Sequence, residues 1–124
     1  MSILFWKAYS NLIRFDLYLA RRDFAGLYER VGSQPIAQSL VPRFTVDQIC
    51  SVVDTACIWY WREVLCLQRS AATASLLRSY GISAQLVIGA QQLPFKAHAW
   101  VEVEGRVVND KPYTNEVYAV LDRS

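Results

Sequence analysis

The sequence predicts an α+β fold in which helices come first and a small antiparallel sheet follows. Up to about residue 81, apolar residues recur with the spacing of helices. From residue 84 onward they alternate with polar residues, as in half-buried strands. The tight-turn signal Glu104-Gly105 separates two such alternating segments, which indicates a β-hairpin. A chain of 124 residues is long enough for one domain, and we expect a single domain over 1–124.

The first helices are predicted from their apolar positions. Residues 3–20 have apolar side chains on several sides, so we expect a largely buried helix there. A second, short helix is expected near 23–31. The segment 32–42 contains Gly, Pro and Ser without any periodicity, which favours a connector.

Two further helices have clear end signals. Thr45 followed by Gln48 three residues later has the form of a capping box, and the helix that begins there should run to about Trp61. A fourth helix is expected over 66–81, where many small residues would let neighbouring elements approach closely. Gly81 is a plausible left-handed stop for it.

The strands are expected at 84–90, 98–105, 106–110 and 117–121. They follow the helices without any further helical pattern between them. This order favours an antiparallel sheet packed against the helices, because parallel strands need long crossover connections.

The hairpin brings the one histidine close to a carboxylate. Folding about Glu104 places Glu102 opposite Arg106, a favourable charge pair, and His98 opposite Asp110. A strict two-residue turn would shift the pairing by one and leave Asp110 as a diagonal neighbour. In either register a carboxylate lies beside the imidazole, where it can fix the tautomer and orient the ring.

Cys66 is the candidate nucleophile for such a pair. It lies in the first turn of its helix, where free amide N–H groups and the helix dipole favour a thiolate and could help to hold an oxyanion. Cys50 and Cys57 are mid-helix and in apolar surroundings, which makes them poorer candidates. The residues alone leave open whether Cys66 and His98 meet, since each also has an ordinary structural interpretation.

Composition and charge exclude several classes of function. The net charge of +2, without a run of basic residues or a Gly-rich phosphate loop, argues against a nucleic-acid partner. Charged residues interrupt the N-terminal apolar segment, so we expect no stable membrane insertion, no cleaved signal and a cytoplasmic protein. An odd number of cysteines without a Cys-x-x-Cys pair disfavours both a disulfide framework and a metal site.

Two motifs carry a resemblance to a known family. The stretches "CLQRSAATASLLRSYG" and "LVIGAQQLPFKAHAWVEVEGRVVND", with the spacing between them, resemble the lasso-peptide leader peptidases. These are small bacterial cysteine proteases of the transglutaminase-like superfamily. The resemblance covers residues 62–110 strongly, and it implies a papain-like catalytic core over 45–124 behind a helical region over 1–44.

The resemblance implies an activity, a site and partners. Such peptidases remove the leader from a ribosomally made precursor through a thioester acyl-enzyme, without a cofactor. Their Cys, His and Asp correspond to Cys66, His98 and Asp110. A separate cyclase then closes the ring. In many such systems a small leader-binding protein delivers the precursor, and the resemblance implies that here it is a separate protein.

Other roles stay open at this point. Arg69, Phe95 and Trp100 are candidates for substrate contact, although packing or a solvated charge would explain them too. An acyltransferase, in which an amine replaces water, and a non-catalytic peptide-binding module with the same fold are the alternative functions. The Cys66 amide is expected to be one oxyanion donor, and the candidates for the second are Trp59, Trp61 and Gln68.

Overall fold

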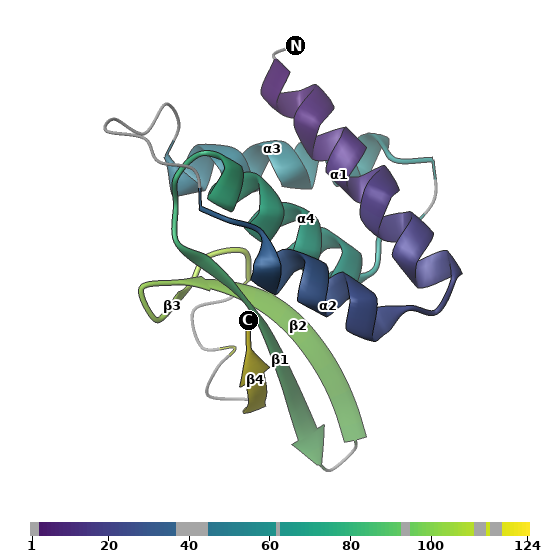
Figure 1. Ribbon diagram of the computed structural model, residues 1–124, viewed down its shortest axis with the longest axis vertical. Coiled ribbons are helices and arrows are strands. Elements are labelled where there is room, and N and C mark those ends of the chain that lie inside the picture. The colour runs from purple at the N-terminus through teal and green to yellow at the C-terminus, as the bar shows by residue number, and fades with distance from the viewer. Residues whose placement is uncertain (1–2, 37–44, 62, 93–94, 111–113, 115–117) are drawn as a thin grey trace.

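The computed structural model describes residues 3–36, 45–61, 63–92, 95–110, 114 and 118–124 (Figure 1). Its helices are α1 (Ile3–Ala20), α2 (Phe24–Ser33), α3 (Val46–Trp59) and α4 (Cys66–Ser79). Its strands are β1 (Ala84–Gln92), β2 (Phe95–Val103), β3 (Arg106–Val107) and β4 (Ala119–Arg123). The predicted α+β class, with helices before strands, is confirmed. Most of the predicted connector over 32–42 lies outside the described residues.

The predicted start signal of α3 and the predicted stop signal of α4 are both present. Thr45 and Gln48 form the complete capping box: the Thr45 hydroxyl accepts from the Gln48 amide at 3.1 Å, and the Gln48 side chain accepts from the Thr45 amide at 2.9 Å. Gly81 follows α4 with a φ of 86°, a left-handed conformation that glycine adopts without strain. Local chemistry therefore determines where these helices start and stop.

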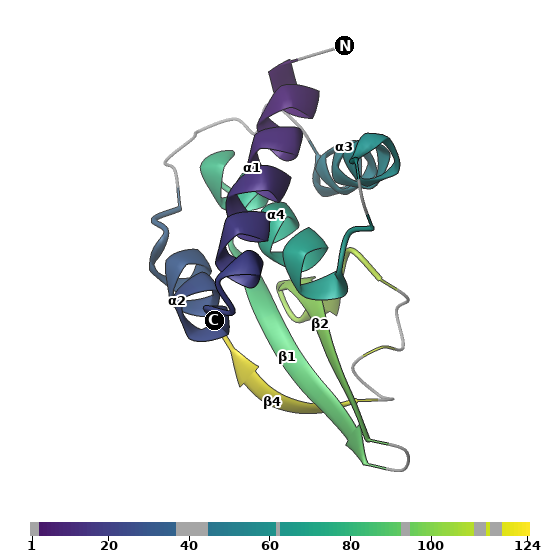
Figure 2. The same cartoon turned by 90° about the vertical axis from the view of Figure 1, so that its right-hand side faces the viewer.

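The helices cover one face of an antiparallel sheet with strand order β3-β2-β1-β4. Figure 2 shows α4 between α1 and the sheet. Side chains from β1 and β2 that face the helices, such as Leu86 and Val101, belong to the same core cluster as Leu12 of α1 and Leu77 of α4. The middle of α4 is buried on all sides, and its small side chains allow this close approach. They are Ser70, Ala71, Ala72, Thr73, Ala74 and Ser75.

The hairpin adopts the alternative register. Glu102 pairs with Val107 and Val103 pairs with Arg106, so the predicted Glu102–Arg106 pair is wrong. The turn consists of Glu104 and Gly105 alone, with φ values of 53° and 78°. Two consecutive residues with positive φ make the tight turn that matches the twist of a hairpin, and this turn sets the register.

The strand predicted over 106–110 is shorter than expected. The strand ends at Val107, and one more backbone bond follows, from the Val108 amide to the Val101 carbonyl at 3.0 Å. The side chain of Asn109 then replaces a backbone group in the ladder, because the Val101 amide donates to Asn109 Oδ1 at 2.8 Å. The edge of β2 near His98 therefore has no strand beside it in the described part of the chain. This open edge positions the candidate site.

The prediction of a largely buried α1 is only half correct. Its inner face is in the core, whereas four large apolar side chains lie on its outer face with 44–66% exposure: Ile3, Trp6, Ile13 and Leu17. Among the described residues, no helix is both long enough and apolar enough to cross a membrane.

Arg78 joins the end of α4 to three other segments. Its guanidinium donates to backbone carbonyls at 2.8–3.2 Å, and the acceptors are Val31, Gly32, Gln34, Ala84 and Ser124. Arginine suits this position because its planar group presents five donors in fixed directions. Burial lowers the pKa of Arg78 from its ordinary value.

Candidate active site

His98 and Asp110 form a direct pair at the open edge of β2. The Nε2 atom of His98 lies 2.5 Å from Oδ2 of Asp110, and both side chains are about one-fifth exposed. Asp110 thus occupies Nε2, which leaves Nδ1 as the ring nitrogen that can accept a proton from a third group. The predicted contact between imidazole and carboxylate is present in the structure.

A hydrogen-bonded chain connects this pair to α4. The Ser70 hydroxyl donates to the backbone carbonyl of Ala99 at 3.0 Å, next to His98. The side-chain amide of Asn109, next to Asp110, donates to the same hydroxyl at 3.0 Å. Since Ser70 is buried and bonds to the neighbours of both residues, it holds their backbone against the helix.

Arg69 adds a second link to the same helix. Its Nη2 atom donates to the Asn109 carbonyl at 3.2 Å, and its Nη1 atom lies 3.8 Å from the Asp54 carboxylate. Residues three and four apart on a helix share one face, so Cys66 lies on the same face as Arg69 and Ser70, about one turn earlier. The start of α4 is therefore tied to the segment that carries His98 and Asp110.

Cys66 is the first residue of α4, and its side chain is half-buried. Leu65 precedes it in an extended conformation and gives the helix no side-chain cap, so the first amide N–H groups keep their capacity for an anion. The described residues contain no hydrogen bond between the Cys66 sulfur and the His98 ring. The structure thus joins His98 to Asp110 directly, and Cys66 to them only through the shared framework.

A cavity of about 410 Å³ borders Cys66. Its wall combines apolar side chains with two charged ones, and it is lined by Cys57, Ile58, Glu63, Val64, Cys66 and Arg69. A concave space next to a candidate nucleophile is the ordinary place for part of a substrate.

The other two thiols are held in the protonated form. Burial raises the pKa of Cys50 to about 12 and that of Cys57 to about 11. Asp54 and Asp47 also raise the pKa of Cys50, and Asp54 that of Cys57, while the Arg69 cation lowers both. A thiol with such a pKa is a poor nucleophile near neutral pH, as predicted for both mid-helix cysteines.

Two aromatic rings hold the imidazole of His98. The ring centroids of His98 and Tyr118 lie 5.1 Å apart, and those of His98 and Trp100 lie 6.0 Å apart. Gly89, which pairs with His98 across β1 and β2, leaves space for these rings: a Cβ there would lie 2.6 Å from Cζ3 of Trp100 and 3.1 Å from Cβ of Tyr118. We call Trp100 and Tyr118 the aromatic bracket.

Glu102 fixes the Trp100 side of the aromatic bracket. The Trp100 indole N–H donates to Glu102 Oε2 at 2.9 Å, and Arg123 Nε donates to Glu102 Oε1 at 3.0 Å. The Glu102 carboxylate is almost fully buried, and both of its oxygens have a partner, as a buried charge requires. The cation that pairs with Glu102 is thus Arg123 of β4 instead of the predicted Arg106.

The structure places the remaining predicted residues in different surroundings. Arg69 borders the cavity beside Cys66. Trp100 is fully buried, so its position fits packing against His98 and not a surface that a peptide touches. The side chain of Phe95 lies outside the described part of the structure. Gln68 is buried and donates its amide to the Leu12 carbonyl at 2.8 Å, which takes it away from an oxyanion role.

Sequence reasoning missed the roles of Ser70, Asn109, Tyr118 and Gly89. Ser70 is part of the Cys-Leu-x-Arg-Ser motif, and Asn109 directly precedes Asp110. Their closeness in sequence to the predicted site residues was the signal that could have identified them. No local signal marks Tyr118 or Gly89, because their contacts depend on how β4 and β1 assemble. The part of the chain described here has no group of three or more His, Cys, Asp or Glu side chains that could hold a metal ion.

Comparisons with known proteins agree with the resemblance predicted from the motifs. Residues 11–123 match the family described as the transglutaminase-like superfamily. The Escherichia coli protein called "Microcin J25-processing protein McjB" is 45% identical over 56 residues, a stretch that covers 45% of this chain and 27% of that protein. No solved structure gives a significant match.

Proposed function

The chain belongs to the transglutaminase-like superfamily, and from this premise we propose that it is a cysteine peptidase that removes the leader from a ribosomally made lasso-peptide precursor. The observation that carries the proposal is the His98–Asp110 pair, held through Ser70 and Asn109 against the helix that begins with Cys66. Similarity to a microcin-processing protein supports a peptide substrate.

In the proposed mechanism, Nδ1 of His98 takes the proton of the Cys66 thiol. The thiolate then attacks the scissile carbonyl, and a tetrahedral oxyanion forms. His98 donates its proton to the leaving amine, which belongs to the core peptide, and the leader stays bound to Cys66 as a thioester. Water, deprotonated by His98, hydrolyses this thioester and releases the leader as a free acid. Asp110 orients the ring and stabilises the imidazolium.

The start of α4 supplies electrostatic stabilisation in this mechanism. The backbone N–H of Cys66 is the first proposed oxyanion donor, and the positive end of the helix dipole favours the thiolate. Trp59 and Trp61 remain proposed sources of the second donor. Their side chains are strongly exposed, so a bound peptide would have to bring them inward.

The cavity beside Cys66 is the proposed binding place of residues that flank the scissile bond. Ile58 and Val64 offer apolar contact, and the Arg69 guanidinium can donate to a substrate carbonyl or carboxylate. Ile58 and its neighbours in the chain, Trp59, Trp61 and Leu65, are all more than half exposed, which offers further apolar surface to a peptide.

We propose a separate leader-binding protein and a lasso cyclase as partners, because the product amine is the group that a cyclase would consume. We assign the reaction to the cytoplasm, where ribosomes release the precursor and where the three free cysteines stay reduced.

Incubation of the purified chain with precursor, leader-binding protein and an added primary amine tests the proposal by mass spectrometry. A free leader acid and an intact core peptide are expected. An amide adduct of the leader would instead identify an acyltransferase. In a reconstituted pathway, equal product formation with wild type and with a Cys66→Ala, His98→Ala variant would identify a non-catalytic binding module.

A further inference from the structure

The outer face of α1 has the pattern of a helix that packs against another helix. Its exposed positions follow the three-four spacing of a coiled-coil seam, and we call them the outer stripe: Ile3, Trp6, Ser10, Ile13 and Leu17. Four of the five are large and apolar. They extend over about four turns, or roughly 21 Å. Such a continuous exposed seam is typical of an interaction site.

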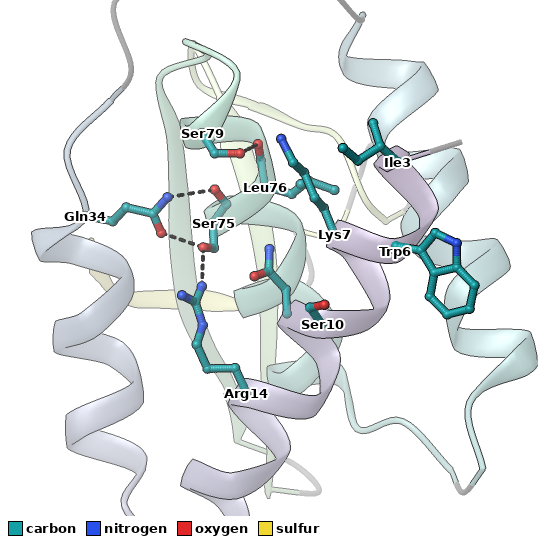
Figure 3. A pocket seen from close by; sticks show the side chains of 10 residues that line it. Ile3, Trp6, Lys7, Ser10, Arg14, Gln34, Ser75, Leu76 and Ser79 are labelled. Atoms are coloured by element: carbon teal, nitrogen blue, oxygen red, sulfur yellow. Dashed lines mark hydrogen bonds between the residues drawn. The ribbon is translucent and has the colours of Figure 1, made fainter. Parts of the chain in front are cut away.

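A groove runs along one side of the outer stripe. It has a volume of about 390 Å³ and lies between α1, the second half of α4 and the residue that follows α2. Figure 3 shows Arg14 and Gln34 meeting at Ser75 in its floor. The described residues that line it include two cations, Lys7 and Arg14, and no acidic side chain.

The two cations lack an anionic partner within the described residues. Lys7 donates to the Tyr80 hydroxyl at 3.2 Å and lies over the Tyr80 ring. Arg14 donates to the Ser75 hydroxyl at 2.7 Å, while its buried Nε has no acceptor in the described part of the chain. Burial, and then repulsion from Arg30, lowers the pKa of Arg14 from its ordinary value. A carboxylate placed in the groove would relieve this unbalanced charge.

We propose that the outer stripe and the adjoining groove bind an acidic amphipathic helix of a partner protein, with carboxylates that reach Lys7 and Arg14. The proposal is independent of the peptidase activity. Because Ser75 and Ser79 of the groove lie near the end of α4 and Cys66 lies at its start, the partner would leave the candidate active site open.

Charge argues against a second copy of this chain as the occupant. Two α1 helices packed together, parallel or antiparallel, would bring Lys7 and Arg14 near the same cations of the other copy. The one acidic residue of α1, Asp16, is buried and accepts a hydrogen bond from the Tyr60 hydroxyl at 2.7 Å, so it cannot neutralise them. A lipid surface is disfavoured as well, because a flat bilayer does not fill a groove lined by Asn11, Gln34 and Ser75.

Fluorescence anisotropy with designed helical peptides tests the proposal. One labelled peptide of about three heptads has Leu at a and d and Glu at e and g; its matched counterpart has Lys in place of Glu. The Glu peptide should bind the full chain at least about tenfold more tightly than the Lys peptide. Cys66→Ala should bind it as wild type does, whatever the outcome of the peptidase assay.

Substitutions in the outer stripe and the groove test whether the Glu peptide binds there. The double variant Trp6→Ser, Ile13→Ser should weaken binding of the Glu peptide at least about tenfold. The single variant Lys7→Glu should weaken it by a similar factor. Arg14→Gln, which can still reach Ser75, gives a second charge variant if Lys7→Glu alters folding. Leu121→Ser removes an equally exposed apolar side chain from β4 and should change nothing. Circular dichroism confirms that each variant is folded.

Several results would overturn the proposal. Equal binding of the Glu and Lys peptides, or binding that the outer-stripe variants leave unchanged, contradicts it. Sedimentation that shows a dimer in wild type and a monomer in Trp6→Ser, Ile13→Ser would make a second copy the occupant. Binding to vesicles of phosphatidylcholine and phosphatidylserine with the same residue dependence, without peptide binding, would assign the surface to a membrane.

Discussion

Nε2 of His98 and Oδ2 of Asp110 lie 2.5 Å apart, although the two residues are twelve positions apart in the chain. The tight turn at Glu104-Gly105 brings β2 and the segment after β3 together, and Asn109 ends the pairing so that Asp110 can approach the ring. This relationship is the geometric basis of the proposed peptidase.

Asp110→Asn should lower kcat by about 10³–10⁴, because an amide cannot hold the imidazole in the same tautomer or stabilise its cation. The midpoint of urea unfolding should change little. Initial rates of precursor cleavage, measured by mass spectrometry, check this. Asp47→Asn replaces an exposed carboxylate of α3 and is the matched control. An unchanged rate in Asp110→Asn would remove Asp110 from the site.

Gly89→Ala should displace the aromatic bracket. The added methyl group would meet the Trp100 ring and lie 3.1 Å from Cβ of Tyr118, so the rings must shift, at a cost of about 1–3 kcal/mol in unfolding free energy. The chain has one histidine, so its imidazole C–H signals in a proton NMR spectrum are unique. They should shift in Gly89→Ala as ring-current shielding changes.

A companion variant makes this test specific to the aromatic bracket. Trp100→Phe removes the part of the indole that a methyl group at position 89 would meet, so the cost of Gly89→Ala should be smaller in that background. If the two costs simply add and the His98 signals stay in place, the aromatic bracket does not hold the ring.

The buried thiols predict a loss of stability at alkaline pH. Their folded pKa values, about 12 for Cys50 and about 11 for Cys57, exceed the value of about 8.5 for a thiol in an unfolded chain. The unfolded state therefore loses these protons first as the pH rises. The stabilisation is complete below about pH 8.5 and is lost as the pH rises through the folded values.

Urea unfolding at pH 7 and pH 10 checks this prediction. Wild type should lose more unfolding free energy between the two pH values than Cys50→Ala, Cys57→Ala does. Tyrosines that titrate in this range contribute equally to both proteins, so the difference isolates the thiols. Equal losses in the two proteins would mean that the thiols are not held protonated by the fold.

Arg78→Lys should lower the free energy of unfolding by about 3 kcal/mol. A lysine ammonium has three donors and no planar fork, so it cannot serve carbonyls of three segments at once. Arg21→Lys, at an exposed position after α1, should cost less than about 0.5 kcal/mol. Similar losses in the two variants would show that the Arg78 contacts contribute little.

Short-range chemistry explains what could be predicted from the sequence. The capping box at Thr45, the stop at Gly81 and the turn at Glu104-Gly105 each depend on a few neighbouring residues, and all are present. The His98–Asp110 contact follows from the same turn. The division into 1–44 and 45–124 stays a prediction, although one core cluster includes residues from both parts.

Features that depend on long-range packing could not be predicted from the sequence. The sequence pattern paired Glu102 with the nearby Arg106, whereas the fold brings Arg123 of β4 to it from 21 positions away. Likewise, the link between Ser70 and Ala99 depends on how α4 lies on β2. The exposure of Ile13 was missed because periodicity shows that a side chain is apolar and does not show what covers it.

The proposal depends most on Cys66 as the nucleophile, and trapping the covalent intermediate tests it directly. The enzyme is mixed with precursor and leader-binding protein, quenched in acid within the first turnover, digested and mapped by mass spectrometry. The account predicts a leader thioester on Cys66, absent in Cys66→Ala and retained in Cys57→Ala. A leader adduct on Cys50 or Cys57, or full precursor cleavage by Cys66→Ala, would contradict it.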